Sequence, residues 1–109
     1  MLKPLLGSDN VERVLIFLNA RQKGYASEIA TFFDTDYGPV QVQLKKLEEG
    51  GVLVSFLEGK TRVYQFNPSY AFLPELKALL EKVFRFYPPE EIERLEMNRR
   101  RPRRSGKPL

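Results

Sequence analysis

The spacing of apolar and polar positions predicts four main helices and one β-hairpin. Apolar residues recur at helical spacing from about residue 9 to residue 20, over 26–33, over 37–49 and over about 72–87. Residues 52–66 instead alternate with a period of two around Glu58-Gly59, which is typical of a hairpin. A short helix over 90–97 should follow Pro88-Pro89. The sequence therefore predicts an α+β, mostly α fold.

The start of the first helix carries two candidate caps. Ser8 or Asp9 can accept a hydrogen bond from a free backbone N–H, and Asp9 with Glu12 fits a capping box. The helix should bury a single apolar face, formed by Val11, Val14, Leu15 and Leu18.

The segment 37–49 divides into two faces of opposite character. Val40, Leu44 and Leu47 share one stripe, which we expect to be buried, and Gly50-Gly51 ends the helix. At about 100° per residue, the opposite face is small, polar and basic. This face consists of Gly38, Gln41, Val42, Lys45 and Lys46.

The helix over about 72–87 has a continuous apolar stripe that exceeds what a small domain easily covers. We therefore expect a partner surface, and interpret the stripe as core plus dimer interface in preference to a ligand pocket. The expected interface residues are Leu76, Leu79, Leu80, Val83, Phe84 and Tyr87.

The composition narrows the class of protein. A chain of 109 residues supports one domain with a modest core. It contains neither cysteine nor histidine, so we expect no enzyme, no metal site and no cofactor. No apolar run is long enough to span a membrane and no signal-peptide pattern is present, so the expected location is cytoplasmic.

The net charge of +4 is unevenly distributed. Residues 1–96 hold twelve Lys and Arg against fourteen Asp and Glu, a balance of −2. Residues 97–109 hold six basic residues and no acid, and should be disordered when free. This tail could lie in a minor groove or along phosphates, could bind RNA or acidic proteins, or could only aid solubility.

Helix, tight turn, helix and hairpin is an order that can place one helix in a DNA groove and a loop on the adjacent backbone. The segment Tyr-Gly-Pro-Val-Gln-Val-Gln-Leu-Lys-Lys-Leu-Glu-Glu-Gly-Gly, residues 37–51, resembles the recognition helix of ArsR-like winged-helix transcriptional regulators. Glu28-Ile29-Ala30 resembles the helix before it, and residues 59–64 resemble the wing. Leu6-Gly7-Ser8 and Arg13 are similar to winged-helix modules associated with minimal nucleotidyltransferases.

Three departures limit what this resemblance implies. Metal-sensing members use cysteine and histidine ligands, so metal sensing does not carry over. The family usually has glycine near Asp34, although aspartate tolerates the left-handed conformation. Asp34 and Asp36 would lie near DNA phosphates, which is unfavourable. No nucleotidyltransferase domain is present, so no catalytic role is implied.

The resemblance implies contacts to double-stranded DNA from the helix over 37–49 and from the hairpin tip over 57–62. Gln41 and Lys45 are the best candidates for base edges, and Val42 could touch a thymine methyl. Ordinary alternatives are a solvated helix face and, for Lys60 and Arg62, charge that protects a hairpin edge. The expected DNA-binding residues are Tyr37, Gly38, Gln41, Val42, Lys45, Lys46, Lys60, Arg62, Arg99, Arg100, Arg101, Arg103 and Arg104.

The sequence thus predicts a homodimeric, sequence-specific transcriptional regulator. Its expected parts are a winged-helix domain over 1–87 with a dimerisation helix over about 72–87, a short helix over 88–96 and a basic tail over 97–109. The alternative is a protein-interaction module, for example one that docks to a separately encoded nucleotidyltransferase-like partner. The acidic balance of residues 1–96 favours this alternative.

Overall fold

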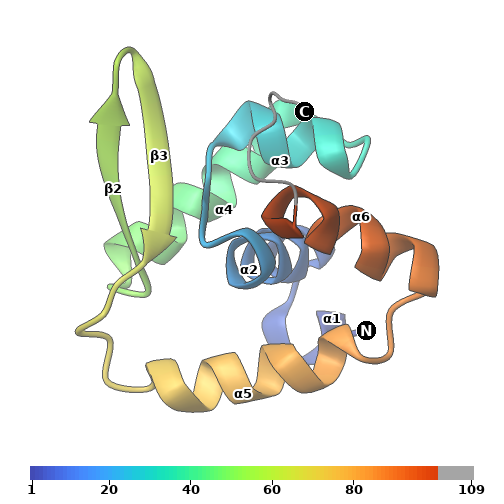
Figure 1. The fold of residues 1–109 in the computed structure, drawn as a ribbon. Coiled ribbons are helices and arrows are strands. Elements are labelled where there is room, and N and C mark those ends of the chain that lie inside the picture. Colours follow the sequence, from blue (N-terminus) through green and yellow to red (C-terminus); the bar gives the residue numbers. More distant parts are fainter. Residues whose placement is uncertain (101–109) are drawn as a thin grey trace.

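Six helices and a three-stranded sheet make up the part of the chain that this computed structural model describes, namely the backbone of residues 1–100 and the side chains of residues 1–96. The elements, in chain order, are α1 (Lys3–Leu6), α2 (Asp9–Arg21), β1 (Lys23–Gly24), α3 (Ala26–Phe32), α4 (Tyr37–Glu49), β2 (Leu53–Glu58), β3 (Thr61–Phe66), α5 (Leu73–Phe84) and α6 (Pro89–Arg100). The fold is α+β and mostly helical, as predicted, and it is compatible with a winged helix (Figure 1).

Helix α2 is the centre of the molecule, with α3, α4, α5 and α6 arranged around it (Figure 1). More of it is buried than the single face expected, since Ile16 and Phe17 are also enclosed, with the Phe17 ring against Phe32 of α3 and Gly24 of β1. Ser8 caps the helix by accepting a hydrogen bond from the Asn10 N–H at 3.0 Å. The predicted Asp9–Glu12 capping box is wrong, because the Glu12 carboxylate accepts from Leu2 N–H and from the Tyr87 hydroxyl instead.

The connection between α3 and α4 is a tight turn. Asp34 adopts a positive φ of 53°, which confirms that an aspartate can serve where a glycine is more usual. The Thr35 N–H then donates to the Ala30 carbonyl at 2.9 Å and fixes the entry into α4. Helix α4 buries Val40 and Leu44, as its apolar stripe predicts.

The sheet has the order β1-β3-β2 and is antiparallel throughout. Glu58 pairs with Thr61, so the turn of the β2–β3 hairpin, hereafter the wing, is Gly59-Lys60, with Gly59 at a φ of 64°. Strand β1 was not predicted. Its Gly24 lies so close to α2 that a β-carbon there would be 2.6 Å from the Phe17 ring, so only glycine fits without displacing that ring.

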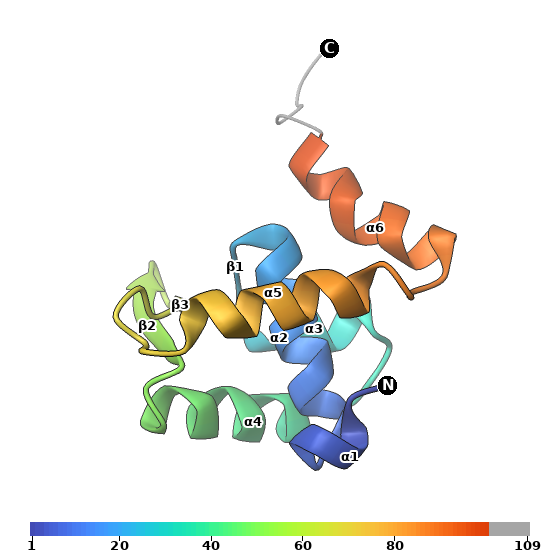
Figure 2. The ribbon, with the colours of Figure 1, turned by 90° about the horizontal axis from the view of Figure 1, so that it is seen from below.

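The two C-terminal helices pack on α2. Helix α5 crosses over it, and α6 returns along another side with Leu95 fully buried (Figure 2). Helix α6 extends to Arg100, beyond residue 96, where the short helix was predicted to end. None of the described helices has the length and apolar character that crossing a membrane requires.

Candidate nucleic-acid interface

The outer face of α4 is open to solvent. The expected contact residues Tyr37, Gly38, Val42, Lys45 and Lys46 are all exposed there, and Val42 keeps 48% of its surface. A β-carbon at Gly38 would meet no atom within 4 Å, so the backbone is accessible at that point. The helix therefore presents a narrow surface with one apolar, one aromatic and two basic side chains.

Gln41 lies one helical turn after Tyr37, at the edge of that face that turns towards the wing. It is only partly exposed and lines a cleft of about 220 Å³ between α4, the start of α3 and the wing. We call this the α4–wing cleft. Its lining residues are Tyr25, Ala26, Ser27, Tyr37, Gln41, Lys60, Thr61, Arg62 and Tyr64. Five of these residues carry a hydroxyl group and two carry a positive charge, and none is a carboxylate.

The two basic residues of the wing have different surroundings. Lys60 is exposed in the turn and has no ion pair or hydrogen bond with any described residue. Arg62 donates from Nη1 to the Ser55 Oγ at 3.2 Å, and Ser55 donates to the Glu48 carboxylate at 2.5 Å. Arg62 therefore also links the wing to the last turn of α4, in addition to any contact it makes with a partner.

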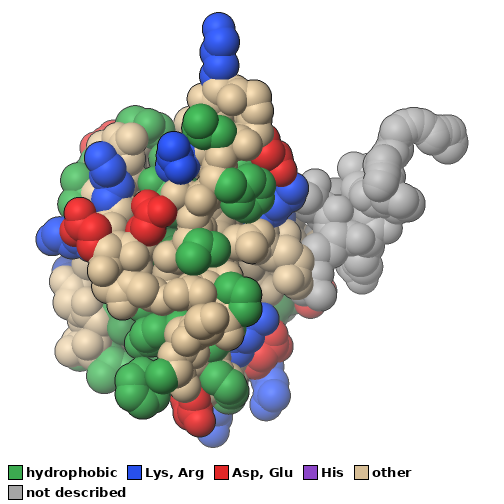
Figure 3. All heavy atoms as spheres, turned by 90° about the vertical axis from the view of Figure 1, so that its left-hand side faces the viewer, with side chains coloured by type: hydrophobic (Ala, Val, Ile, Leu, Met, Phe, Trp, Pro, Cys, Tyr) green, Lys and Arg blue, Asp and Glu red, His purple; other side chains and the backbone are tan. Residues whose placement is uncertain are grey.

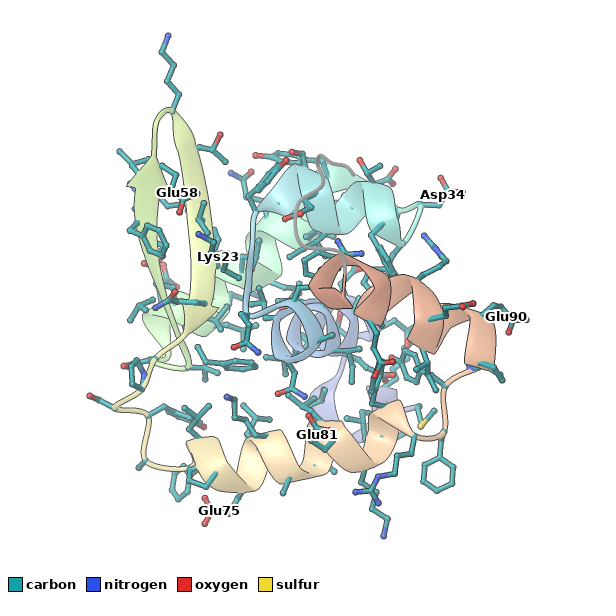
Figure 4. All side chains as sticks on the ribbon, in the orientation of Figure 1. Lys23, Asp34, Glu58, Glu75, Glu81 and Glu90 are labelled. Carbon is teal, nitrogen blue, oxygen red and sulfur yellow. The ribbon has the colours of Figure 1, made fainter. Side chains whose placement is uncertain are left out.

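An ion pair with β1 also braces the wing. Lys23 Nζ lies 2.7 Å from Glu58 Oε2, and the two labelled side chains point towards one another in Figure 4. The pair uses the only carboxylate of the wing strands, because neither β2 nor β3 contains another acidic residue. Lys60 and Arg62 are therefore the charged side chains of the wing that have no ion pair with a described residue.

Tyr64 is the most buried residue of the cleft. It is 4% exposed, and its hydroxyl has no hydrogen-bond partner among the described residues. Burial raises the pKa of the Tyr64 phenol, the nearby Glu48 charge raises it further, and Arg62 acts in the opposite direction. The hydroxyl therefore stays protonated at neutral pH and is a hydrogen-bond donor without an acceptor.

The acidic residues of the α3–α4 turn do not enter this cleft. Figure 4 places Asp34 at the end of α3 farthest from the wing, and neither Asp34 nor Asp36 is among the cleft residues. Asp34 is therefore separated from the cleft by the length of α3, whereas Asp36 directly precedes the cleft residue Tyr37.

The wing side of the molecule also carries apolar surface. Figure 3 shows basic side chains at the tip and flanks of this side, with hydrophobic side chains running down towards the start of α5. Leu57 is 60% exposed and Phe72 63% exposed. This surface carries both basic and apolar side chains, so it offers contacts to an anionic partner and to an apolar one.

The residues expected at a dimer interface lie mostly against their own chain. Leu80 and Val83 are buried in the core of their own chain, and Leu76, Leu79, Phe84 and Tyr87 are partly buried against it. The apolar stripe of α5 is therefore mostly satisfied within one chain by packing on α2. Large apolar side chains that remain exposed are Phe72 before α5 and Phe86 after it.

The arginine-rich tail lies largely beyond what the structure describes. The structure describes only the backbone of Arg99 and Arg100, at the end of α6. The remaining arginines of the expected set, Arg101, Arg103 and Arg104, lie outside the described residues. The C-terminal end of α6 lies on the opposite side of the molecule from α4 (Figure 2).

Comparison with protein-family models and with curated proteins finds no match to this chain. Within residues 1–96, no group of three or more carboxylate side chains is placed to hold a metal ion. The features of this molecule that bear on its function are therefore α4, the wing and the cleft between them.

Proposed function

We propose that this chain binds double-stranded DNA in a sequence-specific way, as a homodimeric transcriptional regulator. Helix α4 enters the major groove, and the wing contacts the adjacent backbone or minor groove. The observation that carries this proposal is the α4–wing surface. There an exposed helix face and two wing cations flank a cleft without carboxylates.

The chemistry of the outer face of α4 fits the edges of base pairs. The major groove is wide enough for a helix, and it displays the thymine methyl as well as guanine and adenine acceptors. Val42 supplies an apolar contact for a methyl group, and Lys45 can reach guanine O6 and N7. Gly38 lets the backbone approach closely, because no side chain intervenes.

Selection of bound duplexes from a random pool tests this proposal. The natural chain should enrich one sequence, whereas Val42→Ala and Lys45→Ala should each change one or two positions of that sequence. Lys77→Ala is the matched control, because Lys77 is exposed on α5, outside the proposed contacts, and makes no ion pair with a described residue. Absence of enrichment with the natural chain would contradict sequence-specific binding.

The dimer is part of the same proposal, with its seam placed on the residues that α5 leaves exposed. Phe72 and Phe86 stand at the two ends of α5, and Glu75 and Lys82 lie between them on its solvent side. Two antiparallel copies of α5 would set Glu75 of one chain against Lys82 of the other, twice, as two-fold symmetry requires. Sedimentation should show a dimer that Phe86→Ser and Lys82→Glu weaken, while Lys82→Glu with Glu75→Lys restores it.

A second candidate is a protein-docking module. It is favoured by the balance of −2 over residues 1–96 and by the exposed Leu57 and Phe72 on the wing side. A gel-shift series with random duplex at low salt separates the two functions. A DNA-binding protein must shift the duplex there, because counterion release makes low salt the most favourable condition.

A further inference from the structure

The α4–wing cleft contains more hydrogen-bond donors than the fold uses. The buried hydroxyl of Tyr64 has no partner, and the Gln41 amide makes no hydrogen bond with a described residue. Arg62 uses one guanidinium nitrogen on Ser55 and keeps its remaining N–H groups. Buried polar groups nearly always have a hydrogen-bond partner, and no described residue supplies one to this hydroxyl, so a group that enters the cleft can be its acceptor.

The acceptor must be anionic or strongly polar, because the lining is cationic and has no carboxylate. Lys60 and Arg62 are the charged residues of the cleft. The carboxylate nearest in the hydrogen-bond network, Glu48, is already occupied by the Ser55 hydroxyl. The hydroxyl groups and the Gln41 amide can pair with a donor or with an acceptor, but the two cations favour an oxyanion over a cation.

The size of the cleft also suits a group larger than water. A water molecule occupies roughly 30 Å³ in the liquid, so a cleft of about 220 Å³ holds a tetrahedral oxyanion together with what is attached to it. Phosphate is the oxyanion that matches these donors, because phenol, amide and guanidinium N–H groups all bind its oxygens well.

We infer that the α4–wing cleft is a binding site for one phosphate group, with Tyr64, Gln41 and Arg62 as its donors. On DNA this group is a backbone phosphodiester, and to that extent the inference rests on the proposed function. A free nucleotide or inorganic phosphate offers the same chemistry. Gln41, which the sequence pattern assigned to base edges, is then a residue that positions the protein on the backbone. Sequence discrimination falls to Val42 and Lys45 on the outer face.

The decisive variant is Tyr64→Phe, which removes the hydroxyl and keeps the ring. We expect affinity for a random-sequence duplex to fall roughly tenfold, the loss typical of one hydrogen bond to a charged group. We expect the melting temperature to stay the same or rise, because the hydroxyl has no partner in the free protein. Tyr70→Phe, outside the cleft, is the matched control and should bind as the natural chain does. An unchanged affinity for Tyr64→Phe, or a lowered melting temperature, overturns the inference.

Gln41→Ala tests the division of roles. Selection from a random pool should enrich the same sequence as the natural chain, with weaker binding to every duplex. A changed sequence at one position would mean that Gln41 contacts a base, which contradicts the assignment.

Titration with inorganic phosphate and with a nucleoside monophosphate separates this inference from the proposed function. Both should shift the tyrosine ring signals of the natural chain in NMR spectra, and the Tyr64 signal should respond most. If the natural chain fails to bind duplex DNA but shows these shifts, the DNA function is wrong and the phosphate site stands. If it binds duplex DNA but Tyr64→Phe binds equally well and no phosphate shift occurs, the site is wrong and the DNA function stands. Failure of both overturns both.

Discussion

The basic residues of this protein fall into two groups with opposite uses. Between α2, α3 and α6, Arg21 and Arg94 lie over the Phe32 ring at 5.1 and 4.2 Å. Arg94 donates to the Phe32 carbonyl, and Arg21 donates to the carbonyls of Arg94 and Leu95. On the α4–wing side, Lys45, Lys46 and Lys60 make no such contact with described residues.

The difference shows that the count of basic residues is a poor guide to what they bind. The two arginines at the packing of α6 on α2 and α3 hold the C-terminal helix in place, so the N–H groups that they use there are not available to a partner. The three lysines are available to an external anion, although the body has a balance of −2. Separating structural from available cations therefore locates the interface better than net charge does.

The largest effect on stability should come from the packing of α6 on α2. Leu95 is fully buried, so Leu95→Ala should lower the free energy of unfolding by about 2–5 kcal/mol. Val42→Ala removes two methyl groups from an exposed position and should change it by less than about 0.5 kcal/mol. Urea denaturation measures both, and equal stability of the two variants would mean that α6 does not contribute to the core.

The next effect concerns the buried Glu12. Burial by itself would raise the pKa of Glu12, but hydrogen bonds from the Tyr87 hydroxyl and the Leu2 N–H outweigh it and leave the pKa below its usual value. A carboxyl with a lowered pKa stabilises the fold above its unfolded pKa, and this contribution is lost as the pH falls through the folded value. The natural chain should therefore lose part of its stability between about pH 5 and pH 3, around the usual glutamate pKa.

Two variants isolate this contribution from that of other carboxylates. Glu12→Gln cannot ionise, so the difference in unfolding free energy between it and the natural chain should shrink as the pH falls. Tyr87→Phe removes a donor to a charged acceptor and should lower stability at pH 7 by about 1.5–3 kcal/mol. A difference that is constant from pH 7 to pH 3 would show that Glu12 has the same pKa in the folded and unfolded chain.

The sequence predicted the elements whose signals are local. Helix α4 was predicted with its observed bounds, because the apolar stripe and Gly50-Gly51 are both within the segment. The wing was found from its alternation and from Gly59. Strand β1 could not be found in this way, because two residues form a strand only through their pairing with β3.

The assignment of surfaces was harder than the assignment of elements. Periodicity shows that Leu80 and Val83 share a stripe, but it does not show whether α2 or a second chain covers that stripe. It placed Gln41 with the outer face of α4, whereas the wing turns that side of the helix into a cleft. Both assignments depend on what lies against a face, which is set by tertiary packing.

Loss of Arg94, which packs on the Phe32 ring, should lower stability less than loss of Leu95. Arg94→Ala removes a cation from the Phe32 ring and one hydrogen bond to a carbonyl, and should lower stability by about 1–2 kcal/mol. Arg85→Ala, at an exposed position after α5, is the control and should be close to neutral. The salt dependence of DNA binding should not change for Arg94→Ala, and a flatter dependence would show that Arg94 meets DNA.

The smallest effect on stability, and the sharpest test of the comparison, belongs to the wing. Lys60→Ala removes a cation without a partner in the fold, so urea denaturation should not distinguish it from the natural chain. Its DNA affinity should fall by a similar factor for every sequence, and the slope of log K against log salt should fall by about 1, as for one phosphate contact. Arg62→Ala should give the same change in slope together with a loss of stability, because Arg62 also holds Ser55 next to Glu48. If Lys60→Ala lost stability, or if Arg62→Ala altered only stability, the division between available and structural cations would fail at the wing, where Arg62 is expected to serve both uses.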